Sequence, residues 1–359
     1  MERFSLGTTL YSGPDALQQL RALCPGRTLL VTDRYFVQCG LAARIAALCG
    51  GPTEIFDRVA PEPTVALVAQ GAAHLARLRP QALLALGGGS VMDCAKEMLS
   101  AVQGGARLIA IPTTSGSGSE VTDFAVLTHE QAKYPLMDPA LRPDVAILDS
   151  DLLQQLPKGL IAETGFDVLS HALESYVAKN AGTISDLLAK EAFSSAFAAL
   201  PASYAGNREV RLKIHKASTM AGLSFTNAGL GLCHAISHAL GGLYHVPHGR
   251  LNGVLLPAVI DCNAHVCGKK YAELARAAGL GGSADTIALR NLKNGLIRLR
   301  RELELPENLM QAGIDPRNLW RNTEAIVSTA MADPCCKTNP MEAEPFLIRR
   351  ILDEVAGHV

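Results

Sequence analysis

Strand-like and helix-like segments alternate through residues 1–150 of this chain, and then the alternation stops. The strand-like segments are short and rich in Val, Ile and Leu, and they span residues 27–33, 53–59, 82–90, 107–114 and 145–149. Stretches with helical periodicity lie between them. Strands joined by helices form an open parallel sheet, because a parallel pair needs a long crossover connection. Two further runs, "FAVLTH" and "KYPLMDP", predict an antiparallel excursion.

The sequence after Asp149 has a different pattern of predicted secondary structure. "SDLLQQLP" predicts the start of a helix with a Ser or Asp cap. From there to the C-terminus the patterns are helical, with no convincing strand, and glycine and proline mark the joints. We therefore predict two domains, an α/β domain over residues 1–150 and an all-helical domain over residues 151–359.

The composition argues against several classes of protein. Hydrophobic residues make up 48% of the chain and charged residues 19%, with a net charge of −1, which disfavours both disorder and a nucleic-acid partner. The N-terminus has no secretory pattern, and no apolar run is long enough to span a membrane. The nine cysteines include no C-x-x-C pair, so we expect reduced thiols in a cytoplasmic protein.

A run of three glycines, in "LLALGGGSVMDCAKEML", joins a predicted strand to a predicted helix. Gly88 and Gly89 would let the backbone approach a ligand closely, and a helix N-terminus at Ser90 offers free N–H groups. Together they would hold a pyrophosphate. The motif is not G-x-G-x-x-G and does not follow the first strand, so a tight strand-to-helix turn is the alternative.

A second polar turn, "IPTTSGSGSEVTD", follows the next strand. The hydroxyl groups of Thr113, Thr114 and Ser117 can donate to phosphate or carboxamide oxygens. Two such turns at the ends of parallel strands converge on one crevice of an open sheet, where ligands are expected. The alternative is a solvated serine-rich loop.

Asp33 ends the strand "RTLLVTD". A carboxylate at this position can accept hydrogen bonds from both ribose hydroxyls of an adenosine and would repel a 2′-phosphate, which favours NAD over NADP. A helix N-cap is an equally good interpretation.

Residues 231–249, "GLCHAISHALGGLYHVPHG", hold four of the ten histidines in an apolar, glycine-rich setting. His234 and His238 are four apart and share one helix face, and Asp167 and His171 have the same spacing in "ETGFDVLSHALESY". His248 follows Pro247 at a helix start.

A single histidine on an apolar helix is most often a satisfied core residue. Several unpartnered imidazoles together would each carry a desolvation penalty, which a shared divalent cation removes. A donor set of aspartate and histidine without cysteine suits Fe²⁺, Zn²⁺ or Mn²⁺.

Several ordered motifs together resemble the iron-containing (group III) alcohol dehydrogenases. They run nearly end to end: "GGGSVMDCAK", "IPTTSGSGSEVT", "LRPDVAILD", "TGFDVLSHALESY", "GLCHAISHALGG", "VPHG" and "ADPCCKTNP". The resemblance implies an N-terminal dinucleotide-binding domain, an all-helical metal-binding domain, and a metal in the cleft between them. It implies NAD and Fe²⁺ as cofactors, with Zn²⁺ as the alternative ion.

The resemblance also implies roles for individual residues. The metal ligands would be Asp167, His171, His234 and His248. His238 would be a non-ligand proton relay, and His245 matches no ligand position and is expected to be structural. The cofactor would contact Gly88, Gly89, Ser90 and Asp93 at its pyrophosphate, and elsewhere Thr113, Thr114, Ser117, Thr122 and Lys133. The substrate would lie against Phe124, Phe225 and Leu230, in a small apolar pocket for C2–C4 aldehydes.

Within the family, the opening "FSLGTTLYSG" and the short length resemble the alcohol dehydrogenases of bacterial microcompartments, which form propanol or ethanol. This likeness implies NAD⁺ recycling inside a microcompartment, with shell or cargo proteins as partners of the N-terminus. An edge strand is the alternative for that segment. We also expect a homo-oligomer. The chain departs from the family at "PEPT", where Glu62 replaces the asparagine of "PNPT", and at Ser117, which replaces a threonine.

Three other functions compete with this interpretation. A dehydroquinate-synthase-like lyase would need a basic cluster near the metal, and residues 160–178 and 217–249 contain little Lys or Arg. A glycerol or diol dehydrogenase would need polar groups where the phenylalanines lie. A non-catalytic shell adaptor would not need the complete ligand and glycine sets.

Overall fold

The computed structural model describes residues 2–103, 105–129 and 132–357. The chain forms two compact units. One unit is Leu6–Gln155, and the other is Leu156–Val359 together with the residues before Leu6. The division therefore falls between residues 155 and 156, a few residues beyond the predicted end of the α/β domain.

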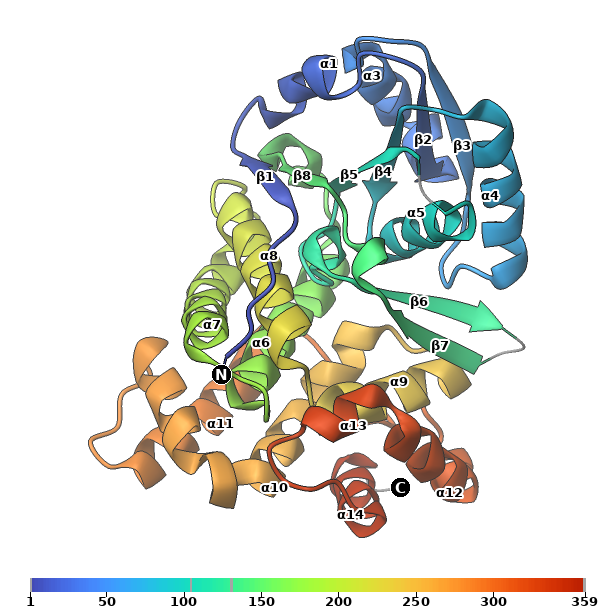
Figure 1. The fold of residues 1–359 in the computed structure, drawn as a ribbon. Helices are drawn as coiled ribbons and strands as arrows, with labels where there is room; N and C mark the ends of the chain where they lie inside the picture. The colour runs from blue at the N-terminus through green and yellow to red at the C-terminus, as the bar shows by residue number, and fades with distance from the viewer. Residues whose placement is uncertain (1, 104, 130–131, 358–359) are drawn as a thin grey trace. The chain divides into compact units, whose positions relative to one another are not determined.

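The α/β unit is built on a six-stranded parallel sheet, in the order β1-β8-β5-β4-β2-β3 (Figure 1). The strands are β1 (Thr9–Ser12), β2 (Thr28–Asp33), β3 (Thr53–Val59), β4 (Ala82–Gly87), β5 (Arg107–Pro112) and β8 (Val145–Leu148). The five predicted strands are confirmed, and the N-terminal segment supplies a sixth at the sheet edge. Both central strands, β4 and β5, are almost completely buried, as expected for a sheet that helices cover on both faces.

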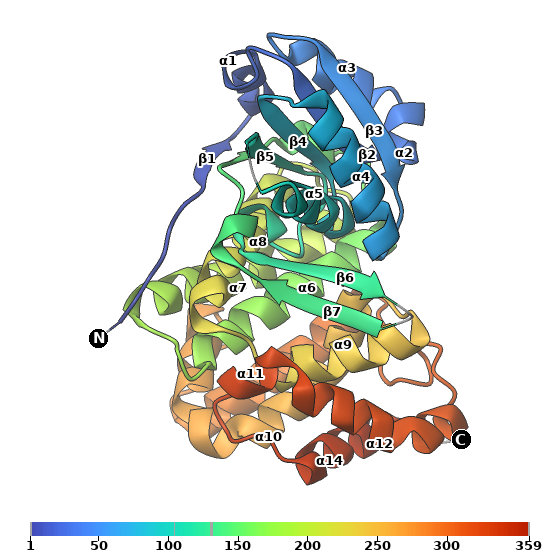
Figure 2. The ribbon, with the colours of Figure 1, turned by 45° about the vertical axis from the view of Figure 1, so that its right-hand side comes forward.

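Alternate side chains of the strands build the two helix-covered faces. Leu84, Ile109 and Ile147 pack with Leu20 of α1 (Leu20–Leu23) and Ile45 of α3 (Leu41–Leu48). The helices α4 (Val65–Leu78) and α5 (Gly89–Ala101) lie side by side on the opposite face (Figure 2). The remaining described helical segments of this unit are α2 (Arg34–Gln38) and the 3-10 helices η1 (Ala16–Gln19), η2 (Ser119–Val121), η3 (Pro139–Leu141) and η4 (Ser150–Leu153).

The predicted antiparallel excursion is a hairpin of β6 (Phe124–His129) and β7 (Ala132–Met137). Lys133 lies in β7 opposite Thr128, and its side chain is outside the part of the chain that the structure describes.

All the regular secondary structure described in the second unit is helical (Figure 1). Its helices are α6 (Lys158–Val177), α7 (Thr183–Tyr204), α8 (Arg211–Ala228), α9 (Leu232–Tyr244), α10 (His248–Ala277), α11 (Asp285–Glu302), α12 (Pro316–Ala332), α13 (Pro334–Thr338) and α14 (Pro345–Val355). Nearly all of α6 is buried in one continuous apolar core, so its few polar side chains are held in fixed positions.

One local prediction is wrong. "SDLLQQLP" forms only a short 3-10 helix, η4 (Ser150–Leu153), and Asp149 caps it by accepting a hydrogen bond from the Asp151 N–H. The long helix α6 begins at Lys158. Pro157 explains the interruption, because a proline disfavours helical backbone in the residue before it.

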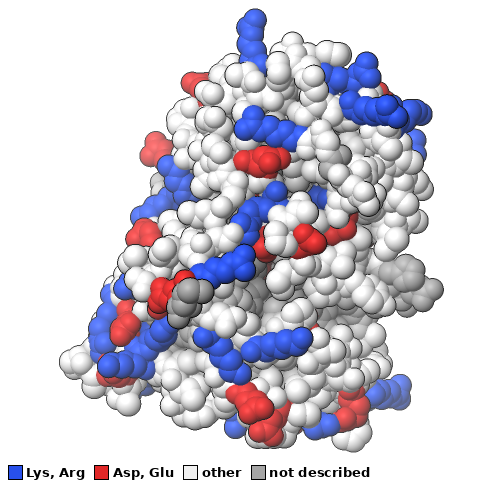
Figure 3. Space-filling model, in the orientation of Figure 1, with Lys and Arg blue, Asp and Glu red and all other residues white. Residues whose placement is uncertain are grey.

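No helix among the described residues has both the length and the apolarity to cross a membrane. On the face of the molecule shown in Figure 3, basic and acidic side chains are interspersed.

Candidate metal and cofactor site

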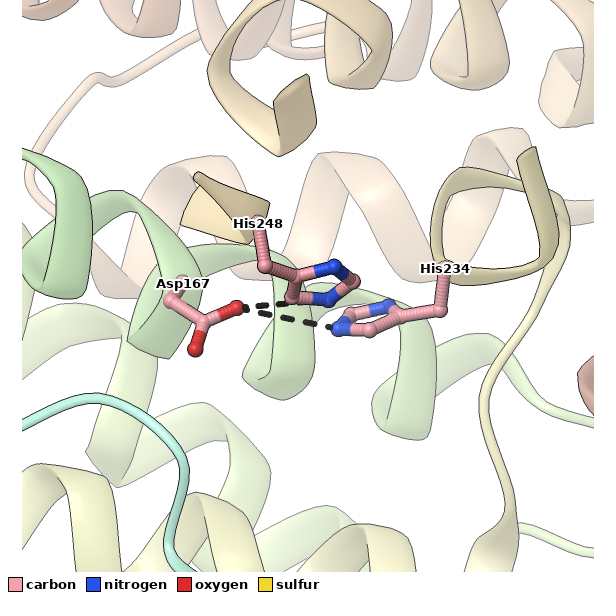
Figure 4. Close-up of side chains that lie close together, drawn as sticks. All are labelled: Asp167, His234 and His248. Carbon is pink, nitrogen blue, oxygen red and sulfur yellow. Dashed lines mark ion pairs between the residues drawn. The ribbon is translucent and has the colours of Figure 1, made fainter. Parts of the chain in front are cut away.

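Three helices of the helical unit bring a carboxylate and two imidazoles together (Figure 4). Asp167 projects from α6, His234 from the first turn of α9, and His248 is the first residue of α10. The Asp167 Oδ1 atom lies 3.7 Å from His248 Nε2 and 4.0 Å from His234 Nε2. One donor atom from each of the three residues lies within 4.8 Å of the others, which is close enough for the three to be candidate ligands of one metal ion.

A glycine allows α10 to approach α6 this closely. Any Cβ atom on Gly249 would overlap the carbonyl oxygen of Glu163 and would lie 3.3 Å from the Asp167 Cβ atom. The residue after His248 must therefore lack a side chain, which explains the glycine of the "VPHG" motif.

His171 lies one helical turn after Asp167, with its Nδ1 atom 3.8 Å from Asp167 Oδ1. Its ring stacks on His234 at a centroid distance of 4.4 Å and on Phe225 at 4.6 Å. His171 thus neighbours Asp167 and His234, but it is not one of the three residues whose donor atoms lie within 4.8 Å of one another, and its role as a ligand stays a prediction. Phe225 and Leu230 are both buried in the same unit, whereas Phe124 begins β6 in the α/β unit.

Burial dominates the electrostatics of this cluster. It raises the pKa of the Asp167 carboxyl, against the favourable charges of His171 and a hydrogen bond from Asn252. It lowers the pKa of His234 well below the ordinary value, and the neighbouring His171 and His238 act in the same direction. Neutral imidazoles facing a buried carboxylate are the donors that Fe²⁺ or Zn²⁺ uses, so the residues present fit a divalent ion.

Two buried residues that the sequence analysis did not select support the cluster. The Glu174 carboxylate lies 2.6 Å from His234 Nδ1, and burial raises the pKa of Glu174 to about 7. The Asn252 side-chain amide donates to Asp167 Oδ1 at 2.9 Å and to Ser170 Oγ at 3.0 Å. Glu174 could have been found from sequence, because it lies seven residues after Asp167 and so shares its helix face.

His238 lies one turn after His234 on α9, and its ring stacks on His248 at 5.0 Å. Its Nδ1 atom is 2.8 Å from Asp333 Oδ2. Asp333 also caps α13 by accepting from the Cys335 N–H at 2.8 Å. Burial acts to raise the pKa of Asp333, but the hydrogen bond and charge of His238 outweigh it and lower that pKa to about 2. Asp333 is a second residue that the sequence analysis missed.

His245 has the structural role expected of it. It ends α9 as the C-cap residue in left-handed backbone, with φ of 54°.

In the α/β unit, the two polar turns do converge. β4 and β5 pair so that Gly87 lies beside Pro112, and each strand leads directly into its turn. A Cβ atom on Gly88 would lie 3.3 Å from Thr114 Oγ1, and one on Gly89 would lie 3.4 Å from Ser117 Oγ. Gly88 is the N-cap residue of α5, so the start of that helix lies next to the hydroxyl-rich turn.

The structure gives other predicted cofactor residues definite protein partners. Asp33 caps α2 by accepting from the Phe36 N–H at 3.2 Å. Both carboxylate oxygens of Asp93 are engaged, one by Ser119 Oγ at 2.9 Å and one by the Val126 N–H at 3.1 Å. The cofactor contacts proposed for Asp33 and Asp93 stay predictions.

Lys96 is a buried lysine that the sequence analysis did not select. Its Nζ atom donates to Ser119 Oγ at 2.8 Å, to Thr122 Oγ1 at 3.1 Å and to the Phe124 carbonyl at 2.7 Å. Burial lowers its pKa to about 8, against the nearby carboxylates. Lys96 therefore holds the second turn onto α5. The three-residue spacing of Asp93 and Lys96 on one helix is the feature of the sequence from which Lys96 could have been selected.

Comparison with known proteins decides the family. The family model of the iron-containing alcohol dehydrogenases matches residues 7–150, and that of the C-terminal part of the Fe-containing alcohol dehydrogenase family matches residues 161–355. The 1-propanol dehydrogenase PduQ of Salmonella typhimurium is 38% identical, over 99% of this chain and 100% of that protein.

The chain belongs to the iron-containing alcohol dehydrogenase family. The NADPH-dependent butanol dehydrogenase of Clostridium saccharobutylicum is 32% identical, over 98% of this chain and 97% of that protein. The solved iron-containing alcohol dehydrogenase of Thermococcus thioreducens superposes with a TM-score of 0.91 at 30% identity, covering 98% of this chain and 99% of the other. This iron-containing alcohol dehydrogenase is thus an oxidoreductase, which sets aside the lyase and the purely non-catalytic alternatives.

Proposed function

We propose that this enzyme is a metal-dependent NAD(H) alcohol dehydrogenase that interconverts short-chain aldehydes and primary alcohols. The observation that carries the proposal is the cluster of Asp167, His234 and His248, whose donor atoms lie within 4.8 Å of one another. The 38% identity to a 1-propanol dehydrogenase supports propanal and acetaldehyde as the aldehydes to test.

Asp167, His171, His234 and His248 would hold the metal, with Fe²⁺ as the first candidate and Zn²⁺ as the second. When bound, such an ion supplies Lewis-acid chemistry for the alcohol or aldehyde oxygen. The chain contributes a dry, fixed setting: Asp167 and His234 are buried, and Asn252 orients the carboxylate from behind. A dry setting strengthens charge interactions within the site.

The cofactor proposal rests on the α/β unit. Gly88, Gly89 and Ser90 at the start of α5 would bind the pyrophosphate, and Thr113, Thr114, Ser117, Thr122 and Lys133 would complete the site. NAD supplies the hydride acceptor when bound. Asp33 favours NAD because its carboxylate would repel the 2′-phosphate of NADP. A sulfoacetaldehyde reductase of Bifidobacterium kashiwanohense, solved in complex with NAD⁺, shares the fold with a TM-score of 0.89 at 26% identity, covering 99% of each chain.

His238 is the proposed proton relay. Its Nδ1 atom is anchored on Asp333, which leaves Nε2 to exchange a proton with the substrate hydroxyl or with solvent. The side chain of His238 is 17% exposed, against 1% for His234, so His238 is the histidine of α9 that can reach solvent.

The substrate pocket is proposed to be small and apolar. Phe225 is buried and stacks on His171, and Leu230 is buried in the same unit. Phe124 is the third residue proposed for the lining. Apolar side chains favour aldehydes of two to four carbons over polyols. We also propose a homo-oligomer that works inside a bacterial microcompartment and recycles NAD⁺ there.

Docking of shell or cargo proteins through the N-terminus would have to compete with contacts inside the chain. The Glu2 carboxylate accepts from the Thr183 N–H, and the Ser5 N–H donates to Asn227.

The test is NADH oxidation with propanal as the substrate. Protein purified without oxygen is stripped of metal and then assayed alone, with Fe²⁺ and with Zn²⁺. We expect turnover with Fe²⁺ that air abolishes. Turnover with Zn²⁺ but not with Fe²⁺ would support the proposed reaction and identify Zn²⁺ as the active ion. No turnover with either ion and any C2–C4 aldehyde would reject the proposal.

A further inference from the structure

Glu174 is a buried carboxylate on the same face of α6 as Asp167, and it is 2% exposed. Its Oε1 atom accepts from the Cys233 N–H at 2.7 Å. Its Oε2 atom accepts from the Gly231 N–H at 2.9 Å and the His234 N–H at 3.3 Å, and lies 2.6 Å from His234 Nδ1. One side chain thus contacts both the backbone and the ring of the same histidine.

The donors around Glu174 define which ring nitrogen of His234 carries the proton. Backbone N–H groups can only donate, so the carboxylate acts as an acceptor for all of them. When Glu174 is ionised, its oxygen at 2.6 Å from Nδ1 requires a hydrogen on Nδ1, which leaves the lone pair on Nε2.

Asn252 leads to the same tautomer from the other side of the ring. Its Nδ2 atom lies 3.4 Å from His234 Nε2 and donates its two hydrogens to Asp167 Oδ1 and Ser170 Oγ. An amide nitrogen accepts no hydrogen bond, so a hydrogen on Nε2 would face a donor and have no partner there. The Oδ1 atom of Asn252 accepts from Ser237 Oγ, which fixes the amide with its nitrogen toward the cluster.

We propose that Glu174 is the positioning residue of the metal ligand His234. Resting on the proposed function, this assigns Glu174 the task of holding the ring with Nε2 aimed at the ion and Nδ1 protonated. Partners of this kind on ligating histidines raise ligand basicity and fix ring orientation.

The same carboxylate also fixes where α9 begins. Three of its contacts are to the first N–H groups of that helix, where negative charge is favourable. Gly231 has to be a glycine, because a Cβ atom there would lie 2.7 Å from Glu174 Oε1 and from Asn339 Oδ1. The helix start and the ligand ring are therefore set by one anchor, and the ring does not have to be ordered when metal binds.

The chain offers a matched control on the same helix. His238 has its own carboxylate at Nδ1, Asp333 at 2.8 Å, but it is not a proposed ligand. Neutralising Glu174 should therefore weaken metal binding, and the same change at Asp333 should not.

The experiment measures the Zn²⁺ affinity of the full-length protein by competition with a chromophoric chelator, for wild type, Glu174→Gln and Asp333→Asn. We expect a 10- to 100-fold weaker affinity for Glu174→Gln, on the order found for such partners, and a change below about two-fold for Asp333→Asn. Equal affinities for wild type and Glu174→Gln would overturn the assignment of Glu174. Failure of the wild type to bind Zn²⁺ or Fe²⁺ would instead overturn the proposed function.

A double-mutant cycle separates an effect through His234 from a general loss of structure. In a His234→Ala background, Glu174→Gln should change Zn²⁺ affinity little, because the residue it positions is gone. An unchanged penalty in that background would show that Glu174 acts through the fold and would reject the proposal.

A measurement on the wild-type protein tests the tautomer of His234 even if the Glu174→Gln variant does not fold. The ¹⁵N spectrum of histidine-labelled, metal-free protein, with His234→Ala for assignment, should show His234 protonated at Nδ1 and not at Nε2. The opposite tautomer would also reject the proposal.

Discussion

His234 and His238 lie on one face of α9 but differ in burial and in the carboxylate that contacts each ring. His234 is buried and is anchored by Glu174, with its other nitrogen toward Asp167. His238 is partly exposed and is anchored by Asp333. Two histidines one turn apart on the same helix are therefore proposed for different roles, His234 as a metal ligand and His238 as a proton relay.

The pH dependence of the free energy of unfolding should show how much the Asp333–His238 pair stabilises the fold. The folded-state pKa of Asp333 is about 2, below the ordinary value of 3.8, so the group stabilises the fold above about pH 4 and loses this effect as the pH falls toward 2. We expect Asp333→Asn, which can still cap α13, to lower the free energy of unfolding by about 2 kcal/mol at pH 6. Urea titrations from pH 6 to pH 2 should show the difference shrinking. A difference that stays constant over that range would contradict this account.

Glu62 occupies left-handed backbone, with φ of 58°, which is unfavourable for most side chains and more tolerable for asparagine. This gives a physical reason for the asparagine of "PNPT" in the family. We expect Glu62→Asn to stabilise the protein by about 0.5–1 kcal/mol in chemical denaturation. Glu62→Gln removes the same charge without the conformational advantage, so an equal gain from both variants would assign the effect to charge.

At the scale of elements, the metal cluster depends on how closely α10 approaches α6. Gly249→Ala would force the two helices apart at His248, because a Cβ atom there overlaps the Glu163 carbonyl. We expect a loss of at least about 2 kcal/mol in stability and a lower metal content, measured by denaturation and by metal analysis.

Gly268 is the matched control for Gly249, because it lies in the same helix and a Cβ atom added to it would meet no heavy atom of the described residues within 4 Å. Gly268→Ala should stabilise α10 by about 0.5–1 kcal/mol, since alanine is the better helix former. Similar losses in both variants would mean that α10 tolerates no substitution, and would remove the special role of Gly249.

At the scale of the whole molecule, a bound metal should stabilise the packing of three helices of the helical unit. Asp167, His234 and His248 come from α6, α9 and α10, so an ion that binds only the folded state stabilises it by mass action. At an ion concentration of about 1,000 times the dissociation constant, the gain is about 4 kcal/mol.

Chelation should therefore lower the melting temperature, and added Fe²⁺ or Zn²⁺ should restore it in calorimetry. His248→Ala is the control, because it removes one proposed ligand from the end of a helix. It should melt like the chelated wild type and respond weakly to metal. A full response of this variant would exclude His248 as a ligand.

Local pattern was sufficient for much of this protein. The strands from Thr28 to Leu148 follow from apolar runs bounded by turns, and the pairing of the two polar turns follows from the geometry of neighbouring parallel strands. The short 3-10 helix at Ser150–Leu153 was misjudged, because Pro157 interrupts a pattern that otherwise looks helical. Asp167, His171 and His234 stand out in the sequence by residue type and by their four-residue spacings, whereas the choice of His248 over His238 as a ligand was implied by the family resemblance.

The partners of those residues were decided only by tertiary structure. Glu174 lies 60 residues from His234 in sequence, Asn252 lies 85 residues from Asp167, and Asp333 lies 95 residues from His238. Glu174 can be noticed in the sequence because it shares a helix face with Asp167, but no pattern marks a carboxylate or an amide as the partner of a particular histidine. That role depends on which helix packs against its own. The sequence alone determined which donor groups the site contains. Helix packing decided which ring nitrogen of each histidine points toward the site, because hydrogen bonds between residues far apart in sequence form only once the core has formed.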